Sequence, residues 1–406
     1  MHFSRSAGLS SKGNEMSDLP LSHLRVLDLS RVRAGPTCVK FFGDFGADVI
    51  KVERIDGGGD PMGDNRYSSD YVNAQRNKRG ITLDLKRPEG VEVLKRLVQS
   101  ADVLVENFRP DVKFRLGIDY ESLAAVNPRL VYTSISAFGE NGPYRKRPGF
   151  DLIAQGMGGL MWLTGYQDRG PLRVGMSPAD LSAGIFAAMG TMIALLEREQ
   201  SGKGQWVQTN LLSSQIMMLD YQAMTWLMDK RIPQQRGNDH PQIVPTGVYR
   251  SSDGFFTLST VGNDSYHRLC NAIGAPELAT DSRFLDATLR EKNRDEMNAA
   301  IDAATVKKTS AEWVEVLNAA GVPAGPIYKL DEMFADPQVQ ESGIAAPLQH
   351  PKLGRIEVLG QPIGLSRTPA QMRSAPPELG EHTDAVLAEA GFTPEEVAAF
   401  RANGVI

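Results

Sequence analysis

The run Arg25-Val-Leu-Asp-Leu-Ser30 is short and apolar, Pro36 begins a helix-length stretch that ends at Gly46, and Asp48-Val-Ile-Lys-Val-Glu53 is a second apolar run. Apolar runs of about four to eight residues are typical of buried strands, and proline suits the first turn of a helix. The segment therefore predicts a strand, a helix and a second strand. A crossover of this length joins parallel strands, whereas antiparallel neighbours need only a short turn.

The same alternation continues further along the chain. Ile81-Thr-Leu-Asp-Leu85, Asp102-Val-Leu-Val-Glu106 and Leu130-Val-Tyr-Thr-Ser-Ile135 are strand-like, and Pro88 lies in the first turn of a helical stretch that ends near Ala101. Strands that alternate with helices form a parallel sheet covered by helices on both faces. The expected fold class is therefore α/β, with a Rossmann-like large domain.

A different pattern follows the helix that is expected to begin near Leu212. Its methionines at positions 217, 218, 224 and 228 favour burial in a core, with a ligand channel as the alternative. Val248-Tyr-Arg250 and Phe255-Phe-Thr-Leu-Ser259 flank the turn-forming Ser251-Ser-Asp-Gly254, which predicts a hairpin. Polar amphipathic helices come next, so this region is expected to be a small α+β domain.

The expected organisation has five parts. Residues 1–18 are a disordered extension in which Met16 is an alternative start, residues 19–211 are the first part of the large domain, residues 212–242 are a linker helix, residues 243–330 are the small domain, and residues 331–406 return to the large domain. The returning part includes the apolar run Arg355-Ile-Glu-Val-Leu359 and helices after Glu381 and Thr393.

Composition excludes several classes of protein. The chain has 406 residues, 41% hydrophobic and 23% charged, with a formal net charge of -5, which is typical of a globular protein and unlike a general nucleic-acid binder. The longest uncharged run, Leu181 to Leu196, is shorter than the roughly 20 residues of a membrane span, so a buried helix and no membrane partner are expected. Cys38 and Cys270 are the only cysteines, which predicts a reducing, cytoplasmic compartment and no zinc site.

Positive charge collects near the ends of the predicted strands. The first strand-to-helix loop, Ser30-Arg-Val-Arg-Ala-Gly-Pro36, lacks the glycine spacing of a dinucleotide site but supplies two arginines, Arg31 and Arg33. Further cations follow at Lys51, Arg54, Arg76, Lys78, Arg79, Lys86, Arg87, Arg109 and Arg115. In an acidic protein this pattern favours a pocket for a phosphorylated ligand, and a solvated charged rim is the alternative.

Asp180 ends the run Arg173-Val-Gly-Met-Ser-Pro-Ala-Asp180, immediately before the apolar helix. Aspartate at such a position often caps the helix by accepting a free backbone N–H. The same position keeps a carboxylate ionised and close to the positive end of a helix dipole, which suits a nucleophile. The residues alone leave both roles open.

Several motifs together resemble the class III CoA-transferases. They are Val26-Leu-Asp-Leu-Ser30 with Ala34-Gly-Pro36, Gly46-Ala-Asp-Val-Ile-Lys-Val-Glu53, Asn77-Lys-Arg79, Asp102-Val-Leu-Val-Glu-Asn-Phe108, Gly139-Glu-Asn-Gly-Pro143, Arg147-Pro-Gly-Phe-Asp151, Gly202-Lys-Gly-Gln205 and Pro376-Pro-Glu-Leu-Gly-Glu-His-Thr383. The combination is specific although no single motif is, and the similarity extends from about Leu19 to Ile406.

This resemblance implies a Rossmann-like large domain, a small domain and two ring-shaped subunits threaded through each other as an interlocked homodimer. It places the catalytic aspartate on Asp180. The substrates it implies are an acyl-CoA and a small carboxylic acid, without a tightly bound cofactor. Its coenzyme A positions fall on Val32, Arg33, Ala34, Arg54, Leu83, Lys86, Asn107, Phe108, Arg109, Arg115, Arg147 and Phe150. These positions coincide with many of the cations noted above, which favours the pocket over the rim.

The reaction that the resemblance implies moves CoA through an aspartyl mixed anhydride and an aspartyl-CoA thioester. Asn210-Leu-Leu-Ser-Ser-Gln215 is similar to the corresponding part of succinyl-CoA-dependent dicarboxylate transferases, which favours succinyl-CoA as the donor and a dicarboxylate as the acceptor. Arg33 stands where formyl-CoA transferases carry a glutamine. We expect its guanidinium to hold the distal carboxylate of a dicarboxylic substrate, with a phosphate contact or solvent exposure as the alternatives.

Three other activities remain as alternatives. Racemases of this superfamily carry a histidine before the aspartate of a Gly-x-Asp triplet, whereas this chain has Gly149-Phe150-Asp151, and phenylalanine cannot exchange a proton. Formyl-CoA:oxalate transferases carry a run of glycines where this chain has Arg236 to Pro245. A non-catalytic CoA-binding protein is the third.

Two histidines are the remaining candidates for the site. His240 is expected to approach the site on a mobile loop, with a structural role equally open, whereas a structural role is favoured for His382, which precedes a helix.

Overall fold

The computed structural model describes residues 19–58 and 65–406 and divides the chain into two compact units. The first unit extends to Gly158 and includes Gly175–Ala223 and Ser342–Ile406, whereas the second consists of Gly159–Val174 and Met224–Glu341. The predicted boundaries differ, because residues 159–174 belong to the second unit and the return to the first begins at Ser342 instead of residue 331. The expected N-terminal extension, including Met16, lies outside the described residues.

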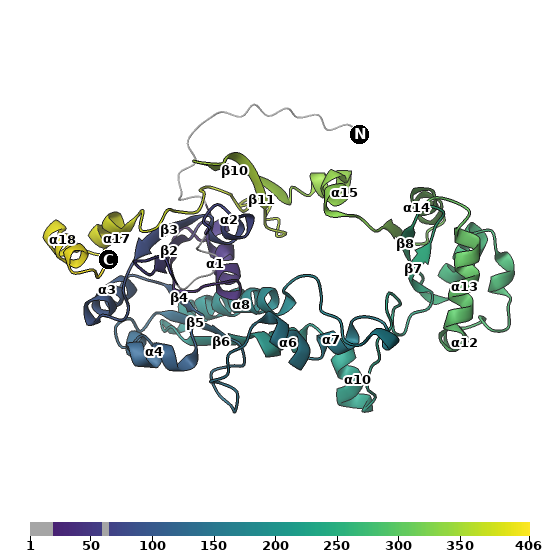
Figure 1. The fold of residues 1–406 in the computed structure, drawn as a ribbon, viewed down its shortest axis with the longest axis horizontal. Helices are drawn as coiled ribbons and strands as arrows, with labels where there is room; N and C mark the ends of the chain where they lie inside the picture. The colour runs from purple at the N-terminus through teal and green to yellow at the C-terminus, as the bar shows by residue number, and fades with distance from the viewer. Residues whose placement is uncertain (1–18, 59–64) are drawn as a thin grey trace. The chain divides into compact units, whose positions relative to one another are not determined.

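A six-stranded parallel sheet forms the centre of the first unit (Figure 1). Its strands are β1 (Arg25–Asp28), β2 (Asp48–Glu53), β3 (Lys78–Thr82), β4 (Val103–Glu106), β5 (Val131–Ser136) and β6 (Trp206–Asn210). They lie in the order β3-β2-β1-β4-β5-β6, and each neighbouring pair is parallel. This is the strand order of a doubly wound nucleotide-binding fold, so the α/β prediction is confirmed.

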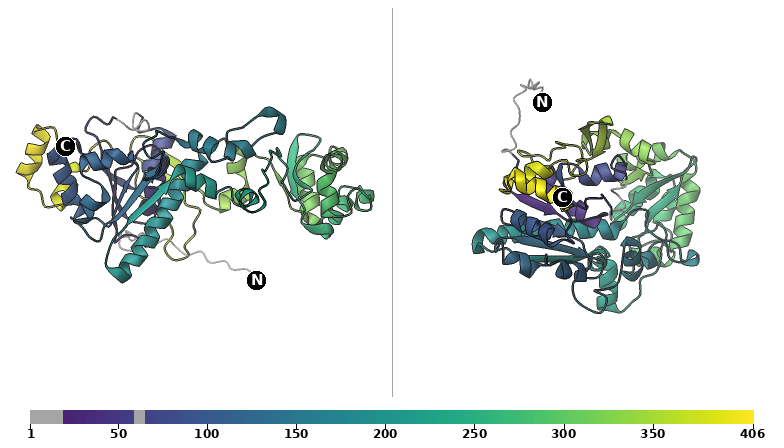
Figure 2. Two further views of the ribbon diagram at one scale, coloured as in Figure 1. Left: turned by 90° about the horizontal axis from the view of Figure 1, so that it is seen from below. Right: turned by 60° about the vertical axis from the view of Figure 1, so that its left-hand side comes forward.

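Helices cover both faces of this sheet, as the two directions of view in Figure 2 show. They are α1 (Ala34–Asp44), α2 (Ser69–Gln75), α3 (Pro88–Val98), α4 (Pro110–Leu116), α5 (Tyr120–Ala124), α6 (Asp151–Met157), α8 (Pro178–Ser201), α9 (Leu211–Met217), α17 (Thr383–Glu389) and α18 (Pro394–Ala402). Successive strand residues point to opposite faces, so Val26 packs with α1 and α8 while Leu27 packs with α3 and α17.

Helix α8 is buried on one face only. Its alanines at positions 179, 183, 187 and 194 are buried against α1 and the sheet, whereas Ile185, Met189, Ile193 and Leu196 form an exposed apolar stripe on the same helix. Among the described residues, α8 is the one helix long and apolar enough to span a membrane by length and composition. The expected fully buried helix is therefore half right, and the stripe needs a separate explanation.

The second unit has its own core. A three-stranded antiparallel sheet of β7 (Thr246–Arg250), β8 (Phe255–Ser259) and β9 (Ala324–Pro326) packs with α11 (Gly262–Ala272), α12 (Ala287–Lys292), α13 (Arg294–Thr305) and α14 (Ser310–Ala319). Strands β7 and β8 form the predicted hairpin, with Arg250 opposite Phe255. The unit also contains α7 (Leu160–Leu163), α15 (Leu330–Ala335), α16 (Pro337–Glu341) and most of α10 (Tyr221–Asp229). The expected single linker helix over residues 212–242 is instead the two helices α9 and α10.

The last part of the chain completes the first unit without extending its sheet. Strands β10 (Ala345–His350) and β11 (Gly354–Leu359) pair only with each other among the described strands, and the run at Arg355, which forms β11, belongs to the first unit. Helix α17 follows beside β3, and α18 begins with a capping box made by Thr393 and Glu396.

Asp44, at the end of α1, forms a buried ion pair with Arg76 and also contacts the last segment of the chain through Gln361. Asp44 accepts hydrogen bonds from Arg76 at 3.1 and 2.7 Å, from Asn77 at 2.8 Å and from Gln361 at 2.6 Å. Both side chains of the Arg76–Asp44 pair are 0% exposed. Removing one partner would leave an uncompensated buried charge, which costs far more than the pair itself contributes.

We predict that Arg76→Met lowers the melting temperature by at least about 5 °C, because the Asp44 carboxylate then has no cation. Thermal unfolding followed by circular dichroism measures this. Arg401→Met is the matched control, since its pair with Asp384 is more than half exposed on both sides. The control should move the melting temperature by less than about 2 °C. Equal effects of the two variants would contradict a structural role for the Arg76–Asp44 pair.

Candidate active site

The loops that follow the strands converge at one edge of the sheet. Because all six strands are parallel, their carboxyl ends meet there, and ligands of doubly wound folds bind at this edge. Helix α8 runs back before β6, so its first turn, with Asp180, starts at the same edge. A Cβ atom on Gly184 would lie 2.6 Å from the Ala34 carbonyl oxygen, so glycine allows α8 to pack directly on the start of α1.

The first strand-to-helix loop is held in place by the loop after β4. Asn107 accepts from the Arg31 backbone N–H at 2.9 Å and donates to the Arg31 carbonyl oxygen at 2.7 Å. The Arg31 guanidinium lies 5.6 Å from the centre of the Phe108 ring. Val32 has a positive φ of 62°, which is strained for a β-branched residue and is typical of functional sites. This loop is therefore preorganised.

Asp180 is the third residue of α8 and is not its N-cap. The N-cap is Ser177, whose side chain makes no capping hydrogen bond. Asp151, the first residue of α6, accepts from the backbone N–H groups of Ala179 at 2.9 Å and Asp180 at 3.4 Å. A carboxylate from another helix thus caps α8, and the side chain of Asp180 is released from that role.

The Asp180 carboxylate is partly buried, and no hydrogen bond or ion pair to it occurs within residues 19–58 and 65–406. The pKa of this carboxyl is raised from 3.8 to about 6, chiefly by burial and next by the neighbouring Asp151 charge, while Arg33 opposes both. A carboxylate with weakened solvation is a better nucleophile than one in water, and it remains mostly ionised at neutral pH. Asp180 therefore has the character of a reactive carboxylate.

Arg33 lies at the N-terminus of α1 and forms an ion pair with Asp70 of α2 at 2.7 Å. Of the guanidinium nitrogens of Arg33, only Nη2 makes a hydrogen bond within the described part of the chain, so the other guanidinium N–H groups remain available. Asp70 orients the guanidinium without saturating it, because an arginine has five donors in a planar arrangement.

Some of the cations noted in the sequence are structural. Lys51 and Lys78 are buried beneath the first loop, where Lys51 donates to the Ser30 carbonyl oxygen at 3.2 Å and Lys78 donates to Asp28 at 2.8 Å. Arg76 is buried against Asp44, as described above. These three side chains are not part of a solvent-accessible phosphate pocket, and Arg79 lies at the opposite edge of the sheet.

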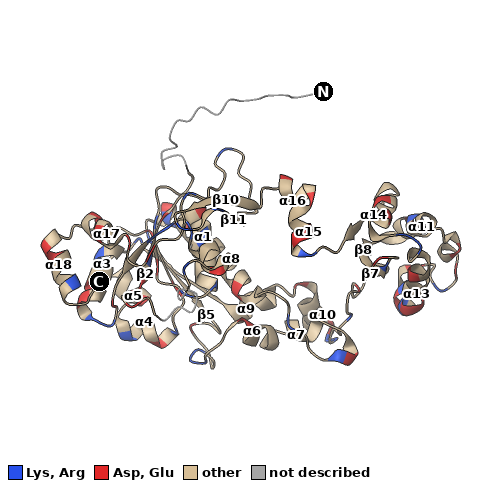
Figure 3. Cartoon of the chain, turned by 45° about the horizontal axis from the view of Figure 1, so that its top comes forward, with Lys and Arg blue, Asp and Glu red and all other residues tan. Residues whose placement is uncertain are grey.

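The other predicted coenzyme A positions are mostly accessible at the carboxyl edge. Arg54 follows β2, Lys86 follows β3, Arg109 and Arg115 follow β4, and Arg147 and Phe150 follow β5; of these, Arg54 is partly exposed and the rest are exposed. Leu83 is 2% exposed and Ala34 is 3% exposed, so only their backbone can face a ligand. Figure 3 shows Lys and Arg interspersed with Asp and Glu on the helices of the first unit. These helices therefore carry charges of both signs.

The two histidines have defined structural contacts. His240 belongs to the second unit, where its Nδ1 accepts from the backbone N–H groups of Gln242 and Ile243 and its carbonyl oxygen accepts from Arg294. Burial and the Arg294 charge lower its pKa. Its predicted approach to the site stays a prediction. His382 accepts from the Gly80 N–H through Nδ1 at 3.2 Å, as its expected structural role requires.

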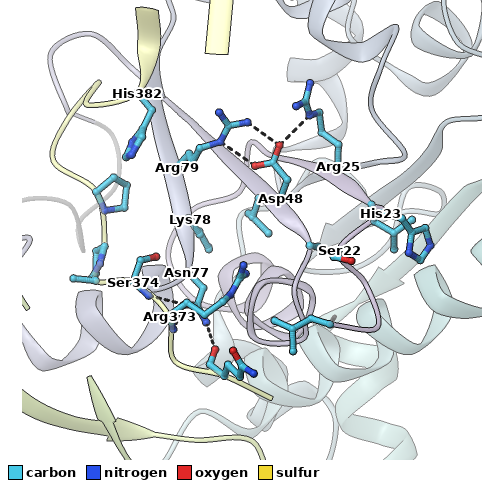
Figure 4. A pocket seen from close by; sticks show the side chains of 18 of the residues that line it. Ser22, His23, Arg25, Asp48, Asn77, Lys78, Arg79, Arg373, Ser374 and His382 are labelled. Carbon is cyan, nitrogen blue, oxygen red and sulfur yellow. Dashed lines mark hydrogen bonds and ion pairs between the residues drawn. The ribbon is translucent and has the colours of Figure 1, made fainter. Parts of the chain in front are cut away.

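The first unit contains a cavity of about 1490 Å³ (Figure 4), and Asp180 is not among the residues that line it. It is lined by Arg25, Asp48 and Lys78, which begin β1, β2 and β3, so it opens at the amino edge of the sheet. Arg25 and Arg79 share the Asp48 carboxylate at 3.0 and 2.7 Å, which neutralises much of the charge that lines the cavity. This cavity is therefore not the candidate active site.

Two residues at the site were missed in the sequence. Asp151 was noted only as the end of the Gly149-Phe150-Asp151 triplet, and Asp70 was not noted at all. Their partners, Ala179 and Arg33, are remote in sequence, so no local pattern signals either contact. Among the described residues, no group of three or more histidines, cysteines, aspartates or glutamates could hold a metal ion.

These features define a doubly wound α/β protein with a reactive carboxylate at the ligand-binding edge of its sheet. The chain belongs to CoA-transferase family III, whose family model matches residues 21–383. The chain is therefore an enzyme of this class, and the resemblance noted in the sequence is confirmed.

Known relatives of the chain match it over most of their lengths. It is 41% identical to succinate–glutarate CoA-transferase of Agrobacterium fabrum, over 91% of this chain and 95% of the relative. It is 37% identical to succinyl-CoA–D-citramalate CoA-transferase of Chloroflexus aurantiacus, over 95% of this chain and 98% of the relative. A crystal structure of a CAIB/BAIF family protein from Brucella suis superposes with a TM-score of 0.81 at 36% identity, covering 92% of this chain and all of that one.

We predict that Asp180→Asn stabilises the protein at pH 8 by on the order of 1 kcal/mol, because the variant removes a partly buried, unpaired charge. The carboxyl has a raised pKa in the folded state, so ionisation costs stability as pH rises from 3.8 through about 6. The gain should therefore vanish below about pH 4, where both folded and unfolded carboxyls are protonated. Melting temperatures at pH 4 and pH 8 measure it, with Glu197→Gln at the exposed far end of α8 as control. A less stable variant at pH 8 would contradict the assignment.

Proposed function

We propose that this enzyme transfers CoA from succinyl-CoA to a second dicarboxylic acid, with Asp180 as the covalent nucleophile. One observation carries the assignment of Asp180. It is a partly buried carboxylate without a partner in the described part of the chain, at the ligand-binding edge of a sheet. Relatives named for glutarate and for D-citramalate share succinate or succinyl-CoA as one substrate, which supports a succinyl donor and leaves the acceptor among several dicarboxylates.

The proposed reaction has four steps. The Asp180 carboxylate attacks the succinyl thioester, which gives a mixed anhydride and releases the CoA thiolate. The thiolate then attacks the Asp180 carbonyl carbon, which releases succinate and forms an aspartyl-CoA thioester. The acceptor carboxylate attacks this thioester, giving a second mixed anhydride and the thiolate. Finally the thiolate attacks the acceptor carbonyl carbon, and Asp180 leaves as a free carboxylate.

Each half of this sequence needs CoA to remain bound while thiolate and carboxylate exchange places. The accessible cations that follow β2, β3, β4 and β5 suit the phosphate groups of CoA, which are best bound by arginine and lysine. We assign these contacts to Arg54, Lys86, Arg109, Arg115 and Arg147. Val32, Ala34, Asn107, Phe108, Leu83 and Phe150 are assigned to the pantetheine and adenine portions of the same ligand. No metal or redox group takes part in any step.

Arg33 is proposed to hold the distal carboxylate of the dicarboxylic substrate. Its guanidinium influences the charge state of Asp180, so it lies near the reacting carboxylate, and its unengaged N–H groups can donate hydrogen bonds to a second anion. A carboxylate bound through two parallel N–H groups is oriented as well as attracted. The acceptor would then be fixed at one end by Arg33 and attack at the other.

We also propose that the enzyme is a homodimer, interlocked as the resemblance implies, and cytoplasmic. The exposed stripe of Ile185, Met189, Ile193 and Leu196 on α8, with Met217 and Met218 beyond α8, is the apolar surface that a second copy would cover. The burial predicted for Met217 and Met218 does not occur in the single chain, where both side chains are exposed. Cys38 and Cys270 are free and buried, which suits a reducing compartment.

We predict that Asp180→Ala lowers kcat for CoA exchange by at least about a thousandfold, because the covalent route is lost. CoA binding should survive, as measured by isothermal titration calorimetry, because the phosphate contacts are elsewhere. Hydroxylamine added with succinyl-CoA should convert Asp180 to a hydroxamate that peptide mass spectrometry detects, and omission of the donor is the control. Hydroxamate on a different carboxylate would move the nucleophile.

We predict that Arg33→Gln raises KM for glutarate by about tenfold or more and changes KM for butyrate little, because only the dicarboxylate has a second anionic end. Arg54→Gln is the matched control, since a CoA contact serves both acceptors equally. Initial rates with a fixed donor concentration measure both. Equal losses with glutarate and butyrate in Arg33→Gln would reassign Arg33 to CoA binding.

A further inference from the structure

The Asp151 carboxylate, beside the proposed nucleophile, accepts several hydrogen bonds. It is 6% exposed, and one oxygen accepts from the backbone N–H groups of Ala179 and Asp180. The other oxygen accepts from Gln155 Nε2 at 2.5 Å. In all three hydrogen bonds Asp151 is the acceptor, which is the pattern of an ionised carboxylate, since a protonated one would need an acceptor of its own.

Gln155 connects this carboxylate to the segment before α8. It is fully buried, and its Nε2 also lies within 3.4 Å of the Met176 carbonyl oxygen. The Asp151–Gln155 pair therefore fixes the first turn of α8 at two places. Asp151 binds the backbone N–H groups of the turn, and Gln155 lies against Met176, which precedes the N-cap Ser177. Ser177 contributes no side-chain cap of its own.

We propose that Asp151 is a positioning residue that both fixes the first turn of α8 and keeps the Asp180 carboxylate reactive through like-charge repulsion. This proposal rests on Asp180 being the nucleophile. A carboxylate that only needed to cap the helix could be an asparagine or a serine, because both caps accept from backbone N–H groups equally well. The negative charge is the part of Asp151 that capping does not require.

Repulsion between the Asp151 and Asp180 carboxylates favours the proposed reaction. The charge of Asp151 disfavours the ionised form of Asp180 and so makes that carboxylate more basic and more nucleophilic. It favours every state in which the Asp180 charge is absent, including the mixed anhydrides and the aspartyl-CoA thioester. The residue thereby stabilises the covalent intermediates relative to the free enzyme without touching substrate.

Few charged groups surround Asp180 among the described residues, so other charges do not obscure the effect of Asp151 on the pKa of Asp180. Helix α6 contributes Asp151, the start of α1 contributes Arg33, and α9, β5 and β6 contain no charged residue. Helix α1 also carries Lys40 and Asp44, which interact with Arg76 and with each other. Burial raises the pKa of Asp180, with Asp151 next in the same direction and Arg33 opposing.

The decisive variant is Asp151→Asn, which keeps the capping oxygen and removes the charge. In a plot of kcat/KM against pH, the midpoint of the acid limb should shift to a lower pH by about one unit, because loss of the like charge lowers the pKa of Asp180. Asp151→Ala should in addition lower the melting temperature, because the cap is lost, and Asp151→Asn should largely restore it. Glu197→Gln, which removes a charge at the far end of the same helix, should leave the profile in place.

A measurement independent of catalysis separates this proposal from the proposed function. The stability gained by Asp180→Asn at pH 8 is compared in the wild-type and Asp151→Asn backgrounds as a double-mutant cycle of melting temperatures. The gain should shrink clearly in the Asp151→Asn background. If it stays the same and the acid limb does not move, Asp151 is only a helix cap and the proposal is overturned. If transfer is absent altogether, the proposed function fails while the cycle still decides the role of Asp151.

Discussion

The first turn of α8 is held by hydrogen bonds from its backbone N–H groups to the Asp151 carboxylate. The arrangement of the site depends on this contact because it places Asp180 as the third residue of a fixed helix turn. Gly184 then allows α8 to lie against the carbonyl of Ala34, which brings Asp180, the proposed nucleophile, to the first strand-to-helix loop. The parallel sheet provides the edge, but the cap determines which side chain is presented there.

Partly or fully buried carboxylates of the first unit differ in whether they contact a cation. Asp28 is fully buried and bonded to Lys78, and Asp44 is fully buried and bonded to Arg76, so each has a cation in the core. Their partners stabilise structure because a lone buried charge would be far more costly. Asp180 has no such cation in direct contact among the described residues. The protein therefore spends part of its stability on keeping one carboxylate poorly solvated, as catalytic groups commonly require.

Local apolar runs were sufficient to predict most of the parallel sheet, the order of its first strands along the chain, and the hairpin of the second unit. They failed where polar residues enter strands. Strand β3 begins at Lys78, and a charged residue does not fit the apolar pattern that predicts a buried strand. In the core this charge is neutralised by Asp28. Strand β6 reads Trp-Val-Gln-Thr-Asn and was missed for a similar reason. The exposed stripe on α8 was also missed, because an apolar helix gives no local sign of which face is covered.

The candidate site shows the same limit more sharply. Asp180 was assigned through combined motifs, since its position alone favoured a helix cap, and the structure gives the cap to Asp151. The contacts of Asp151 with Ala179 and of Arg33 with Asp70 join segments that are remote in sequence. Long-range pairs of this kind depend on how α1, α2, α6 and α8 pack, and a single sequence does not record that packing.

Arg33 and Asp151 act on Asp180 with opposite signs, and this opposition fits a reaction with two anionic partners. In the free enzyme, the Arg33 charge favours the ionised form of Asp180 while Asp151 disfavours it. A dicarboxylate bound to Arg33, as proposed, would neutralise that guanidinium and leave the repulsion from Asp151 unopposed. Asp180 would then become more basic when its substrate is in place, and the binding energy of the distal carboxylate would be used at the reacting end. A monocarboxylic acceptor lacks the second charge and could not produce this change.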